Sequence, residues 1–116
     1  MTAINLAAKL TEFSDHWVPR IITQFNGNDV MLVKIKGEFV WHSHPDTDDL
    51  FLVLQGQVTI QLRDGNVILN PGELYVVLKG VDHCPMSSDE AHLLLIEPAG
   101  TPNTGDPKTA VLKTAI

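Results

Sequence analysis

Two histidines, His42 and His44, stand two residues apart shortly before an apolar segment, residues 49–55, that reads DLFLVLQ. On an extended strand, side chains two residues apart point to the same face, so we expect both imidazoles to face one centre. Aspartates occupy much of the gap, among them Asp48 and Asp49. Imidazole nitrogens and carboxylate oxygens are common ligands of divalent transition metals, and this stretch therefore predicts a metal site.

The predicted ligand set takes one carboxylate from this stretch and a third imidazole from a distant part of the chain. Asp48 and Asp49 are adjacent, so their side chains diverge on a strand and only one of them can join the histidines. His83 follows a glycine turn at Gly80, and we expect it to reach the same centre. Three histidines and a carboxylate suit one divalent metal such as Fe, Mn, Ni or Zn. The strand pattern alone leaves the choice of aspartate open.

Other reactive side chains are interpreted as structural. Cys84 directly follows His83, so on a strand it faces away from the metal and fills a small apolar space. His92 begins an apolar segment and is interpreted as a strand-end residue, with a proton carrier in the cavity as the alternative. His16 has no evident partner, and Asp46 is expected to be solvated at the cavity entrance.

Short β-strands must position these side chains. Apolar or alternating segments recur along the chain, and turn residues such as Asn26-Gly27 and Asp64-Gly65 separate them. Evenly spaced short strands of this kind are typical of a β-sandwich or a small barrel. The segments that we expect to form strands are 20–25, 30–36, 38–44, 49–55, 57–63, 66–70, 73–79 and 91–98.

The two ends of the chain depart from the strand pattern. Residues 4–13 carry apolar side chains with the loose spacing of a short amphipathic helix, for which Asn5 or Thr2 is the expected cap. Residues 99–109 are rich in Pro, Gly, Thr and Asn and predict an extended arm or loop. The last segment, 110–116, is too short to assign.

Alternation also predicts which side chains line the interior beside the metal. Val40, Phe51 and Val53 are expected to face inward, and Glu38 shares the parity of His42, which puts it near the mouth of the cavity.

Phe39 and Trp41 alternate with the ligand histidines and are expected on the opposite face. They form either a surface for a partner or a contact beneath the N-terminal segment.

Composition limits the function classes. The chain has 116 residues, which suits one domain, and its net charge of −6 disfavours both nucleic acid and anionic membrane surfaces. No apolar run approaches the ~20 residues of a membrane-spanning helix, and the N-terminus does not resemble a secretory signal. Cys84 is the single cysteine, so no internal disulfide forms. We therefore expect a cytoplasmic protein.

The first histidine stretch resembles the first motif of the cupin superfamily, in which a glycine, His-x-His, a glutamate and a second glycine follow one another. The corresponding residues here are Gly37, His42, His44, Asp49 and Gly56. A gap of six residues separates Asp49 from Gly56, as in the motif, and this spacing selects Asp49 rather than Asp48.

A later stretch resembles the second cupin motif, which contains Gly, Pro-x-Gly, His and Asn. Gly72, Gly80 and His83 occupy the matching positions. Leu78 stands where the motif has proline, and Ser87 stands where it has asparagine, so neither departure removes a ligand.

Asp49 is the departure that affects the metal site, because the motif usually has glutamate there. Its carboxylate arm is shorter by about 1.5 Å, which is large beside a tolerance of roughly ±0.2 Å in metal–ligand distances. Direct ligation after a shift of the strand, a bridging water and a site of three histidines all stay open. In the last case Asp49 would accept a hydrogen bond from a ligand histidine.

The resemblance implies an all-β fold, namely a double-stranded β-helix (jelly-roll) cupin barrel with a short N-terminal helix and an extended C-terminal arm. It implies a single cupin domain over residues 1–116, with a barrel core over about 20–98. Small cupins of this kind are commonly homodimers, and we expect a homodimer here.

Cupins include isomerases, dioxygenases, decarboxylases and cyclases, so the resemblance does not choose a reaction. The expected function is that of a divalent-metal-dependent enzyme acting on a small oxygenated metabolite, of the isomerase, dioxygenase or cyclase type. A sugar phosphate is disfavoured because the chain has no basic cluster near the motifs. The alternative is a non-catalytic module that holds a metal or a small ligand.

Overall fold

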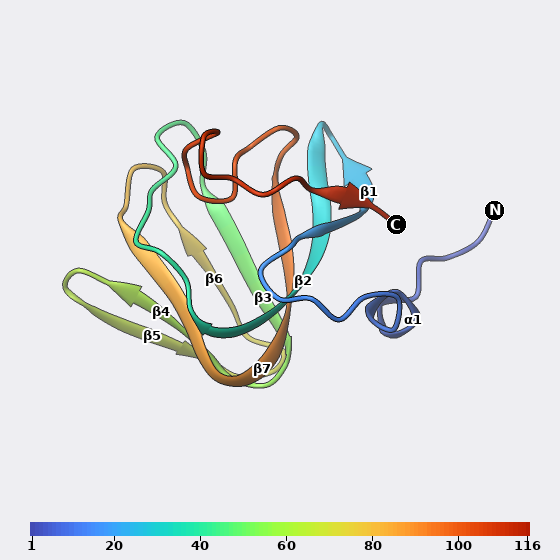
Figure 1. Ribbon diagram of the computed structural model, residues 1–116, viewed down its shortest axis with the longest axis horizontal. Coiled ribbons are helices and arrows are strands. Elements are labelled where there is room, and N and C mark those ends of the chain that lie inside the picture. The colour runs from blue at the N-terminus through green and yellow to red at the C-terminus, as the bar shows by residue number, and fades with distance from the viewer.

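The computed structural model describes residues 1–116 and consists almost entirely of β-strands, with one short helix (Figure 1). It confirms the all-β jelly-roll barrel expected from the motifs. The helix is α1 (Leu6–Leu10). The strands are β1 (Arg20–Phe25), β2 (Asn28–Glu38), β3 (Asp49–Gln55), β4 (Val58–Leu62), β5 (Gly65–Leu69), β6 (Leu74–Val77), β7 (His83–Pro98) and β8 (Thr114–Ala115).

The long strand β7 organises the barrel. Its 16 residues pair antiparallel with β2, β3 and β4, so it curves through both halves of the structure (Figure 1). The sheet runs β5-β4-β7-β2-β1-β8, and β6 joins it through β3. One end of β7 carries His83 and the other end carries Glu97.

Alternate residues of the central strands fill the interior. Val33, Leu93 and Val53 lie side by side on β2, β7 and β3, and all are buried. Because the side chains of a strand alternate, the residues between them face outward. This row is part of the apolar core of the barrel.

The two expected hairpin turns both form, and one of them lies one residue earlier than expected. Asn26 and Gly27 both have positive φ and connect β1 to β2, as in a two-residue type I′ hairpin. The second hairpin turn is formed by Arg63 and Asp64, one residue earlier than expected, and Gly65 already belongs to β5.

The N-terminal helix is capped by Asn5, whose side chain accepts a hydrogen bond from the Ala8 backbone nitrogen at 2.9 Å. No residue of α1 is buried. No helix of this structure has the length and apolarity that crossing a membrane requires.

The predicted strand over residues 38–44 is wrong. β2 ends at Glu38, and residues 39–48 are irregular apart from an isolated bridge at His42. Gly37 has a φ of +83°, which turns the chain out of the extended direction. Beyond this bend the Phe39 backbone nitrogen donates to the carbonyl of Pro85 at 3.0 Å, so the segment follows the start of β7 rather than forming a strand of its own.

The C-terminal arm, residues 99–113, has turns but no strand, in agreement with the expectation for 99–109. Figure 1 shows it looping over one end of the barrel before β8 pairs with β1 in parallel. The chain end is held there by a backbone hydrogen bond of 3.0 Å from Ile116 to Ile21. The arm therefore returns to the sheet after passing over the interior.

Candidate metal centre

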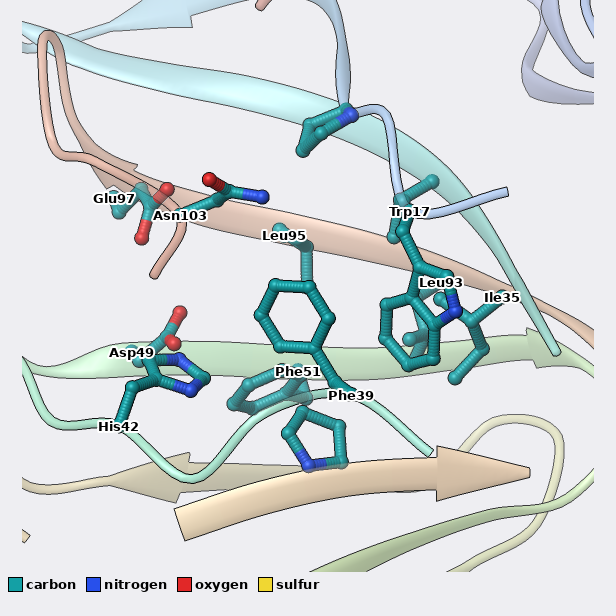
Figure 2. A pocket seen from close by; sticks show the side chains of 13 residues that line it. Trp17, Ile35, Phe39, His42, Asp49, Phe51, Leu93, Leu95, Glu97 and Asn103 are labelled. Carbon is teal, nitrogen blue, oxygen red and sulfur yellow. The ribbon is translucent and has the colours of Figure 1, made fainter. Parts of the chain in front are cut away.

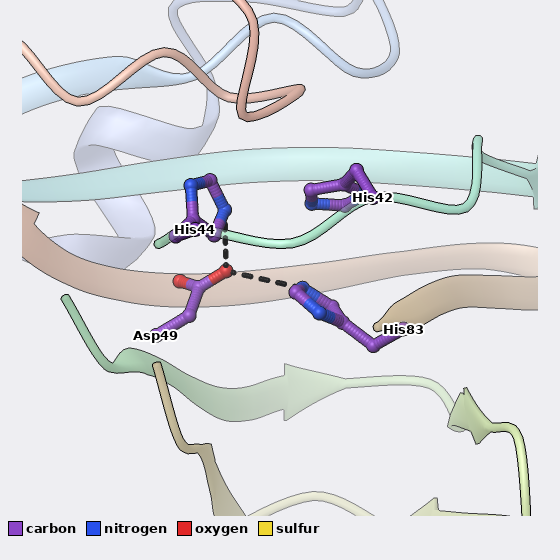
Figure 3. Close-up of side chains that lie close together, drawn as sticks. All are labelled: His42, His44, Asp49 and His83. Atoms are coloured by element: carbon purple, nitrogen blue, oxygen red, sulfur yellow. Dashed lines mark ion pairs between the residues drawn. The ribbon is translucent and has the colours of Figure 1, made fainter. Parts of the chain in front are cut away.

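Three histidines and one aspartate converge inside the barrel. His42, His44, Asp49 and His83 are all buried, and their potential ligand atoms lie within 4.8 Å of one another. Asp49 Oδ2 lies 3.3 Å from His44 Nε2 and 3.5 Å from His83 Nε2 (Figure 3). The motif spacing therefore selects residues that the fold brings together.

Backbone hydrogen bonds between distant segments set this geometry. His42 and His83 exchange bonds in both directions, with N···O distances of 3.0 and 2.9 Å. The carbonyl of His44 accepts from the Gly80 nitrogen at 2.8 Å. Asp49 begins β3 and lies in register with Val77 of β6. The irregular segment after β2 is thus attached to the end of β7 that carries the third histidine.

Two of the imidazoles are oriented by their own backbone. His42 Nδ1 lies 2.8 Å from the Val40 carbonyl oxygen, and His83 Nδ1 lies 2.9 Å from the Val81 carbonyl oxygen. A carbonyl oxygen only accepts, so each Nδ1 carries the proton. Each Nε2 is then left with a free lone pair, which is the form in which a histidine binds a metal.

The buried nitrogens that face the centre have no hydrogen-bond partner. His44 Nε2 and His83 Nε2 are both fully buried and unpaired, because their approach to Asp49 is not aligned as a hydrogen bond. Buried polar atoms are normally paired, and an unsatisfied group costs about 1–3 kcal/mol. A cation between these atoms would satisfy both nitrogens and the carboxylate together, so the donor set fits a divalent metal.

Electrostatics at the cluster favour neutral imidazole at His42 and an ionised carboxylate at Asp49. Burial lowers the pKa of His42 to about 4. Burial also acts to lower the pKa of His44, but the adjacent Asp49 carboxylate outweighs it and the net shift is upward. Burial acts to raise the pKa of Asp49, yet His44 and His83 reverse this effect and hold that pKa below its usual value.

The structure separates the two candidate aspartates. Asp49 is buried and joins the histidines, whereas Asp48 is exposed and its Oδ1 accepts from the Lys79 backbone nitrogen at 2.9 Å. Adjacent side chains on an extended chain diverge, and the one turned inward is the one selected by the gap to Gly56. Asp46 is exposed as well.

A cavity adjoins the cluster and has a polar end and an apolar end (Figure 2). The centre of a water molecule can explore about 40 Å³ of it, which is room for roughly three waters. The residues that line it are Trp17, Pro19, Val33, Ile35, Phe39, His42, Asp49, Phe51, Pro85, Leu93, Leu95, Glu97 and Asn103.

Trp17, Glu97 and Asn103 are among the lining residues that were not predicted from the sequence. Trp17 stacks on Phe39 with ring centroids 4.7 Å apart. Glu97 is 4% exposed, and its Oε1 accepts from Lys113 Nζ at 2.7 Å. Burial and the nearby Asp49 raise the pKa of Glu97, while Lys113 opposes that shift. Asn103 comes from the C-terminal arm.

Several lining predictions require correction, because the segment after β2 does not alternate as a strand. Val40 is 50% exposed and does not line the cavity. Phe39 lines the cavity instead of the outer face, and its contact with Trp17 matches the alternative of packing beneath the N-terminal segment. Trp41 lies outside the cavity, beneath the guanidinium of Arg63.

The remaining lining predictions concern residues of β2 and β3, and only one of them is confirmed. Phe51 lines the cavity as expected. Val53 is fully buried in the apolar core rather than in the cavity wall. Glu38 is exposed, lies 3.2 Å from Gln61 through its side chain, and is not part of the lining.

The remaining histidines and the cysteine lie outside the cluster. Cys84 is fully buried, as expected of a small apolar side chain. His92 is not part of the cavity lining and lies 3.1 Å from Glu90. The strand-end interpretation is wrong, because β7 begins at His83 rather than at residue 91 and His92 lies in its interior. His16 does have a partner, because its Nε2 lies 2.8 Å from the other oxygen of Glu90.

Comparison with known proteins assigns the family. The model of the Cupin domain family (Cupin_2) matches residues 29–97. The Bacillus subtilis (strain 168) protein YdbB, described as uncharacterized, is 34% identical over 80 residues, which is 68% of this chain and 71% of YdbB.

Two solved structures are similar along most of the chain. A cupin-2 domain protein from Shewanella frigidimarina is 47% identical, with a TM-score of 0.81 over 82% of this chain and 93% of that one. Protein NMB1881 from Neisseria meningitidis is 33% identical, with a TM-score of 0.76 over 84% of this chain and 100% of that one. The sequence match, the barrel and the placement of the two motifs agree, and the chain is a member of the cupin superfamily.

Proposed function

We propose that this cupin binds one divalent transition metal (Fe, Mn, Ni or Zn) through His42, His44, His83 and Asp49. We propose further that it acts as a metal-dependent enzyme on a small oxygenated molecule, with isomerase, dioxygenase and cyclase types as the candidates. The supporting observation is the pair of fully buried, unpaired nitrogens of His44 and His83 beside an ionised carboxylate.

The chain supplies what such chemistry requires around the metal. A bound divalent metal polarises a carbonyl or activates water. Val40 and Val81 hold two imidazoles by their backbone carbonyls, so the rings do not need to reorient on binding. Phe39 and Phe51 line the adjoining cavity with apolar surface.

A non-catalytic binding module is the second candidate, and the size of the cavity favours it. Room for roughly three waters suits a metal with a very small ligand better than a metabolite of many atoms. Such a module would hold the metal or a small ligand without converting it.

Elemental analysis of protein purified without added metal tests the ligand set. We expect about one metal ion per wild-type chain, and loss of most of it in His83→Gln and in Asp49→Asn. The matched control is His92→Gln, because His92 is also a buried histidine of the same strand but lies outside the cluster. Equal metal content in His83→Gln and wild type would refute the proposed site.

Two measurements then separate the enzyme from the binding module. Metal-loaded protein is incubated with hydroxyacetone, and NMR follows deuterium exchange next to the carbonyl while an electrode follows oxygen uptake. An isomerase or a dioxygenase accelerates one of them in a manner that Asp49→Asn abolishes. A metal-loaded protein that accelerates neither supports the binding module.

A further inference from the structure

One carboxylate on the cavity wall has no role among the proposed metal ligands. We propose that Glu97, with Asn103 beside it, forms a second recognition site at the polar end of the cavity. This site selects ligands that carry a hydroxyl group next to a metal-binding carbonyl oxygen. The inference rests on the proposed function, because the metal would hold the carbonyl oxygen of such a ligand.

Glu97 is a buried acceptor with one oxygen free. It is 4% exposed, and carboxylates are seldom buried without compensating partners. Lys113 occupies Oε1 at 2.7 Å, and no protein donor contacts Oε2. Figure 2 shows the Glu97 carboxylate at the same end of the cavity as Asp49 and His42. A free carboxylate oxygen therefore faces the space next to the metal ligands.

Asn103 presents a complementary donor. Its Oδ1 accepts from the Val111 backbone nitrogen at 3.1 Å, which fixes the orientation of the amide. Nδ2 has no protein acceptor, and Figure 2 shows the Asn103 side chain next to Glu97. A hydroxyl group both donates and accepts, so it matches a free carboxylate oxygen and a free amide NH₂ together.

A purely structural role accounts for only part of this arrangement. The pair of Glu97 and Lys113 attaches the C-terminal arm to β7, but a buried ion pair is rarely more stabilising than apolar contacts of the same size. Attachment of the arm requires neither the free Oε2 nor the free Nδ2 on the cavity wall. Recognition of a ligand requires both.

The rest of the cavity defines the class of ligand. An anionic group placed against the free Oε2 of Glu97 would be repelled by that carboxylate, so a neutral hydroxyl is favoured at this position. Phe39 and Phe51 offer an apolar surface to hydrocarbon. The volume encloses on the order of a few heavy atoms. The expected ligand is a small neutral hydroxycarbonyl compound with the hydroxyl on the carbon next to the carbonyl.

Hydroxyacetone and butanone form a matched pair of probes, because they differ only by a hydroxyl in place of a methyl group. Saturation-transfer NMR titrations give the affinity of each probe for metal-loaded and for metal-free protein. We expect wild type to bind hydroxyacetone at least about tenfold more tightly than butanone, since a hydrogen bond to a charged group is involved. Glu97→Gln should bring this ratio close to one, because Gln keeps an oxygen for Lys113 but turns an NH₂ toward the cavity.

Glu38→Gln is the control, since Glu38 is an exposed carboxylate outside the cavity lining, and it should keep the wild-type ratio. Should Glu97→Gln not fold, Asn103→Leu has a similar shape and lacks the donor, and its ratio should also fall. Unchanged preference in either folded variant overturns the inference and leaves Glu97 as an attachment for the arm.

Measured metal content separates this inference from the proposed function. A metal-loaded wild type without preference for hydroxyacetone overturns the recognition site and leaves the metal site intact. A wild type that takes up no metal, yet shows a preference that depends on Glu97, overturns the metal site and leaves the recognition site.

Discussion

At the scale of single residues, His42 is held in the neutral form by its surroundings. His42 donates its Nδ1 proton to Val40, and burial lowers its pKa to about 4. The neutral ring with a free Nε2 is the form that binds a metal, and it is maintained far below physiological pH. Metal uptake at this residue therefore requires no loss of a proton from the ring.

The same shift predicts how the stability of metal-free protein depends on pH. Below about pH 6.5 the unfolded chain protonates His42, whereas the folded protein does so only near a pKa of about 4. The free energy of unfolding should thus fall as the pH drops from about 6.5 to about 4. His42 accounts for roughly 3 kcal/mol of that loss.

Urea titrations of metal-free wild type and of His42→Gln across this pH range measure the difference. Other titrating groups are common to both proteins, so the additional loss in wild type isolates His42. Parallel pH profiles would show that the His42 ring titrates with an ordinary pKa in the folded protein.

Residue spacing predicts the cluster but not the cavity wall. His42, His44, Asp49 and His83 are recognisable because two motifs fix their distances along the chain. Glu97 could not be found in this way. It lies at the C-terminal end of β7, and it is paired with Lys113, which is the last residue of the C-terminal arm. That contact is tertiary and leaves no local pattern.

At the scale of elements, strands bounded by turn residues are the easiest to predict. β3 spans Asp49–Gln55 as expected, because its alternation ends at Gly56. The segment after Gly37 looked like a strand by composition, but its partners are single backbone groups of β7 rather than a full ladder. The strand propensity of a segment does not show whether distant strands are available to pair with it.

The C-terminal arm packs directly on the segment that carries the histidines. A Cβ atom on Gly105 would lie 2.1 Å from the Ser43 carbonyl oxygen, and no side chain fits there unless the arm moves. Ser43 separates the two histidines His42 and His44. The C-terminal arm therefore packs against the backbone that carries two of the proposed metal ligands.

We predict that Gly105→Ala detaches the arm and lowers the midpoint of thermal unfolding. Gly100→Ala is the matched control, because Gly100 also has positive φ on the same arm but nothing within 4 Å of a Cβ. The control carries only the conformational cost, about 1 kcal/mol, and Gly105→Ala should lose clearly more. Limited proteolysis should cut the arm faster in Gly105→Ala, and equal rates in the two variants would exclude the close contact as a restraint.

At the scale of the whole molecule, the outer surface of the barrel is relevant to the expected homodimer. Leu94, Leu52 and Leu74 lie in one row across β7, β3 and β6, and Leu74 is 57% exposed. Homodimer interfaces are richer in apolar surface than the rest of a protein, so we propose this row as the contact of the expected homodimer.

Sedimentation equilibrium tests that prediction. We expect a mass close to twice the 12.8 kDa of one chain at micromolar concentration. A mass of one chain at every concentration up to the millimolar range would rule the dimer out.

The arm that passes over the cavity also sets a limit on kinetics. Asn103 forms part of the wall, and β8 ties the chain end to β1 beyond it. A guest too large for the cavity as the C-terminal arm now borders it would be accommodated only after this arm lifts from the barrel. Binding of such guests proceeds no faster than the arm lifts, and at high guest concentration their observed rate of entry reaches a plateau that is the same for chemically different guests.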